Sequence, residues 1–135
     1  MRHIFTYGSL MFADVFDNIV RGRYQPVPAY IKQFKRTQIH GDSYPVVLPN
    51  PHAGVLQGVV YLDVSTTDCR RLDRFEGVYY KRQSTQAWSD AHEPLQVDLY
   101  VLKPKFRYLA SRRPWSAEDF QNKHKQRFRK LYQPQ

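Results

Sequence analysis

Apolar and polar residues follow two different periodicities along this chain, one typical of strands and one typical of helices, and the periodicity changes where glycine or proline occurs. Short extended runs, rich in aromatic and β-branched residues, predict strands over 3–7, 29–35, 44–48, 55–62, 80–88 and 95–102. These runs cluster between the helical segments instead of alternating with them, which favours an α+β fold over a doubly wound parallel sheet. Because many short strands in a small domain must cover their edges, we expect a small closed or nearly closed barrel.

The segment from Tyr7 to Leu10 joins the first predicted strand to a predicted helix. The apolar stripe of this helix consists of Phe12, Val15, Phe16, Ile19 and Val20. Ser9 is its candidate N-cap, and Gly22 would end it. Backbone N–H groups in such a turn lack intrahelical partners and can bind a carboxylate or a developing oxyanion. The alternative is an ordinary strand-to-helix connection, and Ser9 lacks the flanking glycines of a nucleophile elbow.

Glu76 is the first candidate catalytic residue. It ends a helix predicted over Thr66–Glu76, which begins at a capping-box-like Ser65 and stops before Gly77. Its spacing from Leu72 places it on the apolar face that is directed to the core. Burial and the negative end of the helix dipole both disfavour the carboxylate, so the pKa should rise toward the range of a general base. A solvated glutamate at a fraying helix end is the alternative.

A formal net charge of +9 first suggests a nucleic-acid partner. The segment up to Leu102, however, holds 11 basic and 10 acidic residues, whereas the remainder holds 10 basic residues against two acidic ones. The excess therefore lies on a C-terminal segment, with a predicted helix over about 116–132 whose apolar stripe would dock on the domain. A solvated basic helix face is the commoner explanation, and the exposed aromatic residues of a single-strand platform are missing. We therefore do not expect a nucleic-acid partner, and contact of the basic helix face with nucleic acid or an acidic partner is the alternative.

Cysteine and histidine usage narrows the chemistry further. The single cysteine, Cys69, excludes an intramolecular disulfide and fits a small core residue on an apolar helix face. The five histidines show no metal-ligand spacing, so we expect no metal and no other cofactor.

A chain of 135 residues has room for one domain. No signal peptide or membrane span is evident, which predicts a cytoplasmic protein without membrane contact, and nothing indicates an oligomeric state.

Three motifs occur in order within residues 3–102. They are Tyr7-Gly8-Ser9-Leu10, then Tyr44-Pro45 leading to Val55-Leu56-Gln57-Gly58-Val59-Val60-Tyr61, then Leu72-Asp73-Arg74-Phe75-Glu76-Gly77 followed by Tyr80 and Arg82. Together they resemble the γ-glutamylcyclotransferase-like family, in particular its short AIG2-like members. The resemblance implies a single domain over 1–135, built as a closed six-stranded mixed β-barrel flanked by helices.

The resemblance also implies a reaction. Family members cyclise a γ-glutamyl compound to 5-oxoproline and release an amino acid or amine. Glu76 would take a proton from the substrate α-ammonium and return one to the leaving amine, while Tyr7, Gly8, Ser9 and Leu10 would supply N–H donors without a metal. A module of the same fold that binds a small amine or carboxylate without turnover is the alternative function.

Two residues on the strand after Glu76 complete the predicted site. Tyr80 would line the pocket and donate a hydrogen bond. Arg82, two residues further, would share its strand face, with an ion pair or a barrel-filling role as the alternative. Val78 and Tyr79 depart from the polar residues common in short members, so the resemblance does not extend to the choice of γ-glutamyl compound.

Overall fold

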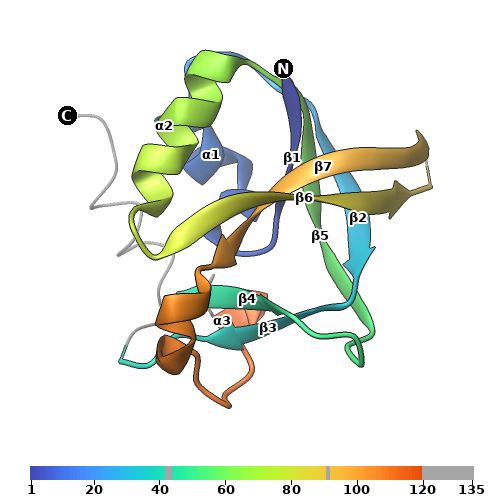
Figure 1. The fold of residues 1–135 in the computed structure, drawn as a ribbon. Helices are drawn as coiled ribbons and strands as arrows, with labels where there is room; N and C mark the ends of the chain where they lie inside the picture. The colour runs from blue at the N-terminus through green and yellow to red at the C-terminus, as the bar shows by residue number, and fades with distance from the viewer. Residues whose placement is uncertain (42–43, 91, 120–135) are drawn as a thin grey trace.

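The structure, a computed structural model, describes residues 1–41, 44–90 and 92–119 (Figure 1). Its strands are β1 (Arg2–Thr6), β2 (Pro26–Lys32), β3 (Phe34–Gln38), β4 (Pro45–Pro49), β5 (Val55–Val64), β6 (Tyr80–Ser89) and β7 (His92–Leu102). Its helices are α1 (Ala13–Ile19), α2 (Thr66–Glu76) and α3 (Ala117–Asp119), with 3-10 helices η1 (Ser9–Met11) and η2 (Pro104–Leu109). No helix in these ranges is long and apolar enough to cross a membrane.

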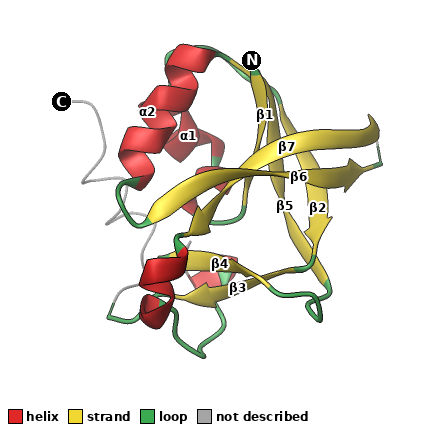
Figure 2. Cartoon of the chain, in the orientation of Figure 1, coloured by secondary structure: helices red, strands yellow, loops and turns green. Residues whose placement is uncertain are grey.

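A closed mixed barrel confirms the predicted α+β class. Its strand order is β1-β5-β2-β6-β7, with β1 and β7 parallel and the other neighbours antiparallel. Successive side chains of a strand point to opposite faces. Phe5 and Val60 therefore belong to the cluster that fills the barrel, whereas Ile4 and Tyr61 belong to a second cluster with residues of α1 and α2. These two helices lie side by side on one flank of the barrel (Figure 2).

The barrel has five strands, so the expected number of six is wrong. The run 29–35, predicted as one strand, is divided at Gln33, whose φ of +67° is left-handed. β2 ends before this residue, and β3 leaves in a new direction to form a separate two-stranded sheet with β4 (Figure 1). Proline at both ends of β4 removes two backbone donors, which disfavours a further barrel strand.

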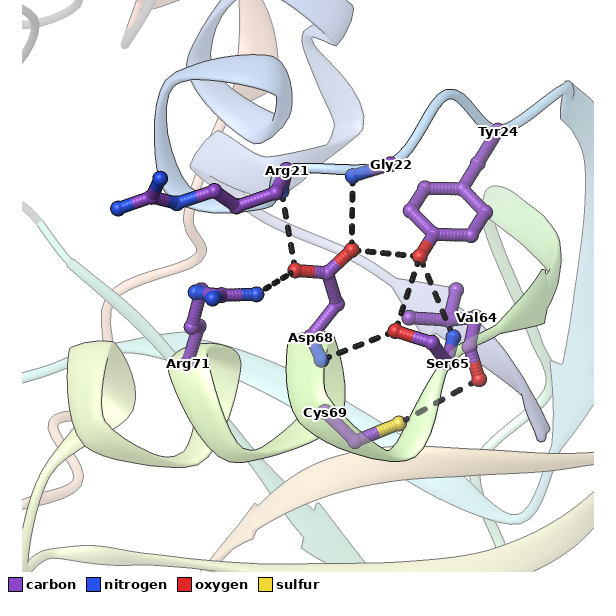
Figure 3. Close-up of polar contacts among 8 residues, drawn as sticks. All are labelled: Arg21, Gly22, Tyr24, Val64, Ser65, Asp68, Cys69 and Arg71. Atoms are coloured by element: carbon purple, nitrogen blue, oxygen red, sulfur yellow. Dashed lines mark hydrogen bonds and ion pairs between the residues drawn. The ribbon is translucent and has the colours of Figure 1, made fainter.

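The second helix forms as predicted. Ser65 Oγ accepts a hydrogen bond from the Asp68 N–H at 3.1 Å, and Gly77 follows the helix with a φ of +83°. Figure 3 shows that the Asp68 carboxylate does not stay within the helix but reaches the backbone N–H groups of Arg21 and Gly22, each at 2.9 Å. The helix is therefore capped locally and also tied to the segment that enters β2.

The first helix is shorter than predicted. An extended Phe12, with φ −86° and ψ 119°, separates η1 from α1. Ser9 consequently lies inside η1 and is not an N-cap, and α1 ends at Ile19, before Gly22. Of the helix predicted over about 116–132, the described chain shows α3, and the rest of that prediction lies outside the described residues.

Candidate functional site

A cavity of about 370 Å³ lies where η1, the end of α2 and the β3–β4 pair meet. Its volume is within the range of about 300–1,000 Å³ that small-molecule sites occupy. Most of the predicted site residues line it: Tyr7, Gly8, Ser9, Leu10, Glu76 and Tyr80. Aromatic side chains, including Tyr44, Phe75, Tyr79 and Tyr100, supply much of the remaining wall. The turn from Tyr7 to Leu10 and Glu76 therefore line one cavity.

Glu76 is the last residue of α2 and is half-buried at the cavity wall. Burial, with a smaller contribution from the Asp73 carboxylate one turn earlier, raises its pKa from 4.5 to about 8. No described side chain or backbone group offsets this by hydrogen bonding to the carboxyl group. A carboxyl that gains and loses its proton near neutral pH meets the requirement of a general acid and base.

The turn after β1 lines the same cavity and contains backbone N–H groups that the turn itself does not use. In η1 the N–H groups of Met11 and Phe12 donate to the Gly8 and Ser9 carbonyls at 3.0 and 3.1 Å. Ser9 and Leu10 come before these two donors in the chain. Their own N–H groups donate to no backbone acceptor among the described residues. Donors of this kind can stabilise a carboxylate or an oxyanion.

Glycine is required at the start of this turn by the packing of β4. A Cβ atom added to Gly8 would come within 2.5 Å of Cγ of Pro45. Pro45 also lines the cavity and is buried. The close approach therefore joins the turn to β4 and gives a packing reason for the Tyr-Gly-Ser-Leu and Tyr-Pro motifs to occur together.

The cavity tyrosines are held by hydrogen bonds to the protein. The Tyr7 hydroxyl donates to the Tyr100 carbonyl at 2.5 Å, and burial raises the pKa of Tyr7 well above its usual value. The Tyr80 hydroxyl donates to the Pro45 carbonyl at 3.1 Å. Its proton is thus already engaged, and a hydrogen bond from Tyr80 to substrate stays a prediction.

Arg82 lies beside the cavity in a polar pocket that shares Tyr80 and Tyr100 with it. Its Nε is 3.3 Å from Asp73 Oδ1, and its Nη1 is 3.7 Å from Asp98 Oδ2. The ion-pair alternative therefore describes its contacts in the structure. Direct contact between Arg82 and substrate stays a prediction.

Two residues near the site were not identified from the sequence. Asp73 accepts a hydrogen bond from the Tyr100 hydroxyl at 2.7 Å, and its three-residue spacing from Glu76 could have indicated that the two carboxylates share a helix face. Arg36 donates from Nη1 to the Tyr7 carbonyl at 2.7 Å across 29 positions of the chain, so no local signal could have found it. Among the described residues, His, Cys, Asp and Glu side chains form no group of three that could hold a metal ion.

Comparison with known sequences identifies similar proteins. The family model described as "Gamma-glutamyl cyclotransferase, AIG2-like" matches residues 4–122. AIG2-like protein C of Arabidopsis thaliana is 33% identical over 103 residues, which are 76% of this chain and 59% of that protein. AIG2-like protein D of the same plant is 32% identical over 107 residues, covering 78% of this chain and 70% of that protein. The chain therefore spans less than two thirds of protein C.

Solved structures show the same architecture. The solution structure of an Arabidopsis thaliana protein superposes with a TM-score of 0.71 and 25% identity, over 97% of this chain and 87% of that one. A structure named gamma-glutamyl cyclotransferase superposes with a TM-score of 0.63 over 76% of this chain and 66% of that one. At 16% identity, the second likeness supports the fold alone.

Proposed function

Because this chain belongs to the AIG2-like gamma-glutamyl cyclotransferase family, we propose that it cyclises a γ-glutamyl compound to 5-oxoproline and releases an amino acid or amine. The observation that carries the proposal is the position of Glu76, which lines the same cavity as the turn from Tyr7 to Leu10. A carboxyl group with a pKa of about 8 thus lines the same cavity as the turn that would supply the backbone donors.

In the first step, the Glu76 carboxylate takes one proton from the substrate α-ammonium. The free amine then attacks the γ-carbonyl carbon, a new C–N bond closes the five-membered ring, and the carbonyl oxygen becomes an oxyanion. We assign the stabilisation of this charge to the backbone N–H groups of Ser9 and Leu10, which donate to no backbone acceptor in the described residues. Holding both reacting groups of one substrate molecule in the cavity keeps the attack intramolecular, which lowers its entropic cost.

In the second step, the protonated Glu76 carboxyl gives its proton to the leaving nitrogen, and the original C–N bond breaks. The restored carboxylate then accepts the second proton from the ring nitrogen and passes it, directly or through solvent, to the released amine. Two protons therefore move from the attacking to the leaving nitrogen, and the net reaction consumes no water. One carboxyl group can serve both transfers because its pKa is near the working pH.

A panel of γ-glutamyl amino acids and γ-glutamyl amines tests the proposal. We expect 5-oxoproline release, measured by chromatography with mass detection, from at least one compound. The matching α-glutamyl isomers are the control, because their geometry cannot form the five-membered lactam at the scissile bond. Lack of release from every compound would contradict an enzymatic role, and binding of 5-oxoproline without turnover would favour a binding module.

The rate is expected to depend on pH through Glu76. The free-enzyme pKa of about 8 lies above the ordinary value, so the base form falls about tenfold for each pH unit below 8, and kcat/KM should fall with it. A bound α-ammonium favours the carboxylate, so the acid limb of kcat should lie at lower pH than that of kcat/KM. Initial rates between pH 5.5 and 9.5 measure the acid limb of kcat and that of kcat/KM. If neither parameter falls on the acid side, Glu76 is not the base.

A further inference from the structure

Arg36 contacts the turn from outside the set of residues that line the cavity. It lies on β3 and donates from Nη1 to the Tyr7 carbonyl at 2.7 Å. Its guanidinium is 4.8 Å from the ring centroid of Trp115, a buried residue, and the two side chains line a different pocket. Arg36 is not among the described residues that line the cavity, whereas Tyr7 and Gly8 are.

The hydrogen bond to Tyr7 also fixes its neighbour, because Tyr7 and Gly8 share one peptide group. A trans peptide is planar, and its carbonyl and N–H point in opposite directions. With the Tyr7 carbonyl directed to Arg36, the Gly8 N–H is directed to the other side of the turn. The next peptide is held as well, since the Gly8 carbonyl accepts from the Met11 N–H at 3.0 Å. Pro45 approaches Gly8 so closely that a Cβ atom added to Gly8 would lie 2.5 Å from its Cγ, so β4 packs directly on this turn.

We propose that Arg36 is a positioning residue that orients the Tyr7–Gly8 peptide so that the Gly8 N–H becomes a donor to the substrate. The inference rests on the proposed function. A charged donor on the carbonyl oxygen polarises the peptide group and strengthens its N–H as a donor. Preorganised donors contribute most where charge develops, at the γ-carbonyl oxygen of the tetrahedral intermediate. Arg36 thus acts on the reaction through the backbone, without touching the substrate.

Replacing Arg36 by methionine tests the inference. Because loss of a single oxyanion donor lowers kcat by about 10²–10³-fold, we expect the loss of its orientation to lower kcat by about 10- to 100-fold. KM and the acid limb of kcat/KM should change little, because Glu76 is untouched. Arg36→Lys should recover part of kcat, since an ammonium can also donate to the Tyr7 carbonyl. Lys35→Met is the matched control, because it removes an exposed cation from the adjacent position of β3.

Three outcomes separate this inference from the proposed function. A folded Arg36→Met enzyme with kcat within twofold of wild type would overturn the inference and leave the function intact. If Arg36→Met does not fold, Arg36→Gln keeps a polar side chain at this half-buried position and is judged by the same limit. If the wild type releases no 5-oxoproline, the proposed function is wrong. The role of Arg36 is then tested by NMR, from the change in the Gly8 amide resonance when 5-oxoproline is added. A shift in the wild type that Arg36→Met removes supports it, and an equal shift or none in both contradicts it.

Discussion

Replacing Glu76 by glutamine is expected to abolish 5-oxoproline release while leaving the cavity intact. Glutamine has nearly the shape of glutamate but can neither accept the proton of the α-ammonium nor donate one to the leaving amine. Loss of a general acid and base lowers rates by about 10²–10⁴-fold, so we expect kcat to fall by at least 100-fold. Rate measurements with the best γ-glutamyl substrate test this. Glu93→Gln, at an exposed site on β7, is the charge-matched control.

The same substitution should stabilise the protein, which sets it apart from general damage to the fold. The pKa of Glu76 is about 8 in the folded protein and 4.5 ordinarily, so the unfolded chain ionises first as the pH rises. Wild-type stability should therefore decline between about pH 4.5 and pH 8, by about 1.4 kcal/mol for each unit of pKa difference and a few kcal/mol in all. Glutamine carries no charge and escapes this decline.

Thermal melts at several pH values measure the effect. Glu76→Gln and wild type should melt together at pH 4, and the variant should melt higher at pH 8. An inactive variant with unchanged or lowered stability at pH 8 would contradict the burial and raised pKa of Glu76. A variant that retains wild-type kcat would contradict its catalytic role.

Replacing Asp68 by alanine is expected to cause the largest loss of stability. Asp68 is 2% exposed, and Figure 3 shows its carboxylate surrounded by donors. These are the N–H groups of Arg21 and Gly22, the Tyr24 hydroxyl at 2.5 Å and Arg71 Nη1 at 2.6 Å. Alanine would remove the acceptor that these four donors share. Removing one partner from a buried charged network costs about 3–5 kcal/mol, so the melting temperature should fall by more than about 10 °C.

The pH dependence of this loss gives a second readout. Burial alone would raise the pKa of Asp68, but the hydrogen bonds from Tyr24, Arg21, Gly22 and Arg71 outweigh it and hold the pKa below its usual value of 3.8. The contribution of the carboxylate is therefore complete above about pH 4 and is lost as the pH falls further. The difference between wild type and Asp68→Asn should shrink in acid. Asp17→Ala, at an exposed position of α1, is the control, and an equal effect of both alanine variants would contradict the network.

Neighbouring residues in the sequence determined the elements that carry Glu76. Ser65 caps the first turn of α2, and Gly77 takes the positive φ that ends it. Capping involves groups only a few positions apart, so the ends of this helix can be predicted from the sequence. The strands that follow were also predicted, over 80–88 and 95–102, and the structure has Tyr80–Ser89 and His92–Leu102.

The division of the strands among sheets depended on tertiary packing. The run 29–35 contains neither glycine nor proline at the point where it divides, so its alternation predicted one strand. Gln33 adopts a left-handed conformation, which a glutamine in the sequence does not predict. This residue separates β2 from β3, and β3 pairs with β4 outside the barrel, so the predicted strand over 44–48 is the one that the barrel lacks.

The sequence by itself determined the family motifs, the helix that ends at Glu76 and the candidate turn from Tyr7 to Leu10. Only the tertiary structure decided that both line one cavity, that Arg82 pairs with Asp73 beside it, and that Arg36 reaches the Tyr7 carbonyl. The physical reason is distance along the chain. Caps and periodicity act between neighbours, whereas these contacts depend on how the barrel closes and on where β3 is placed after Gln33.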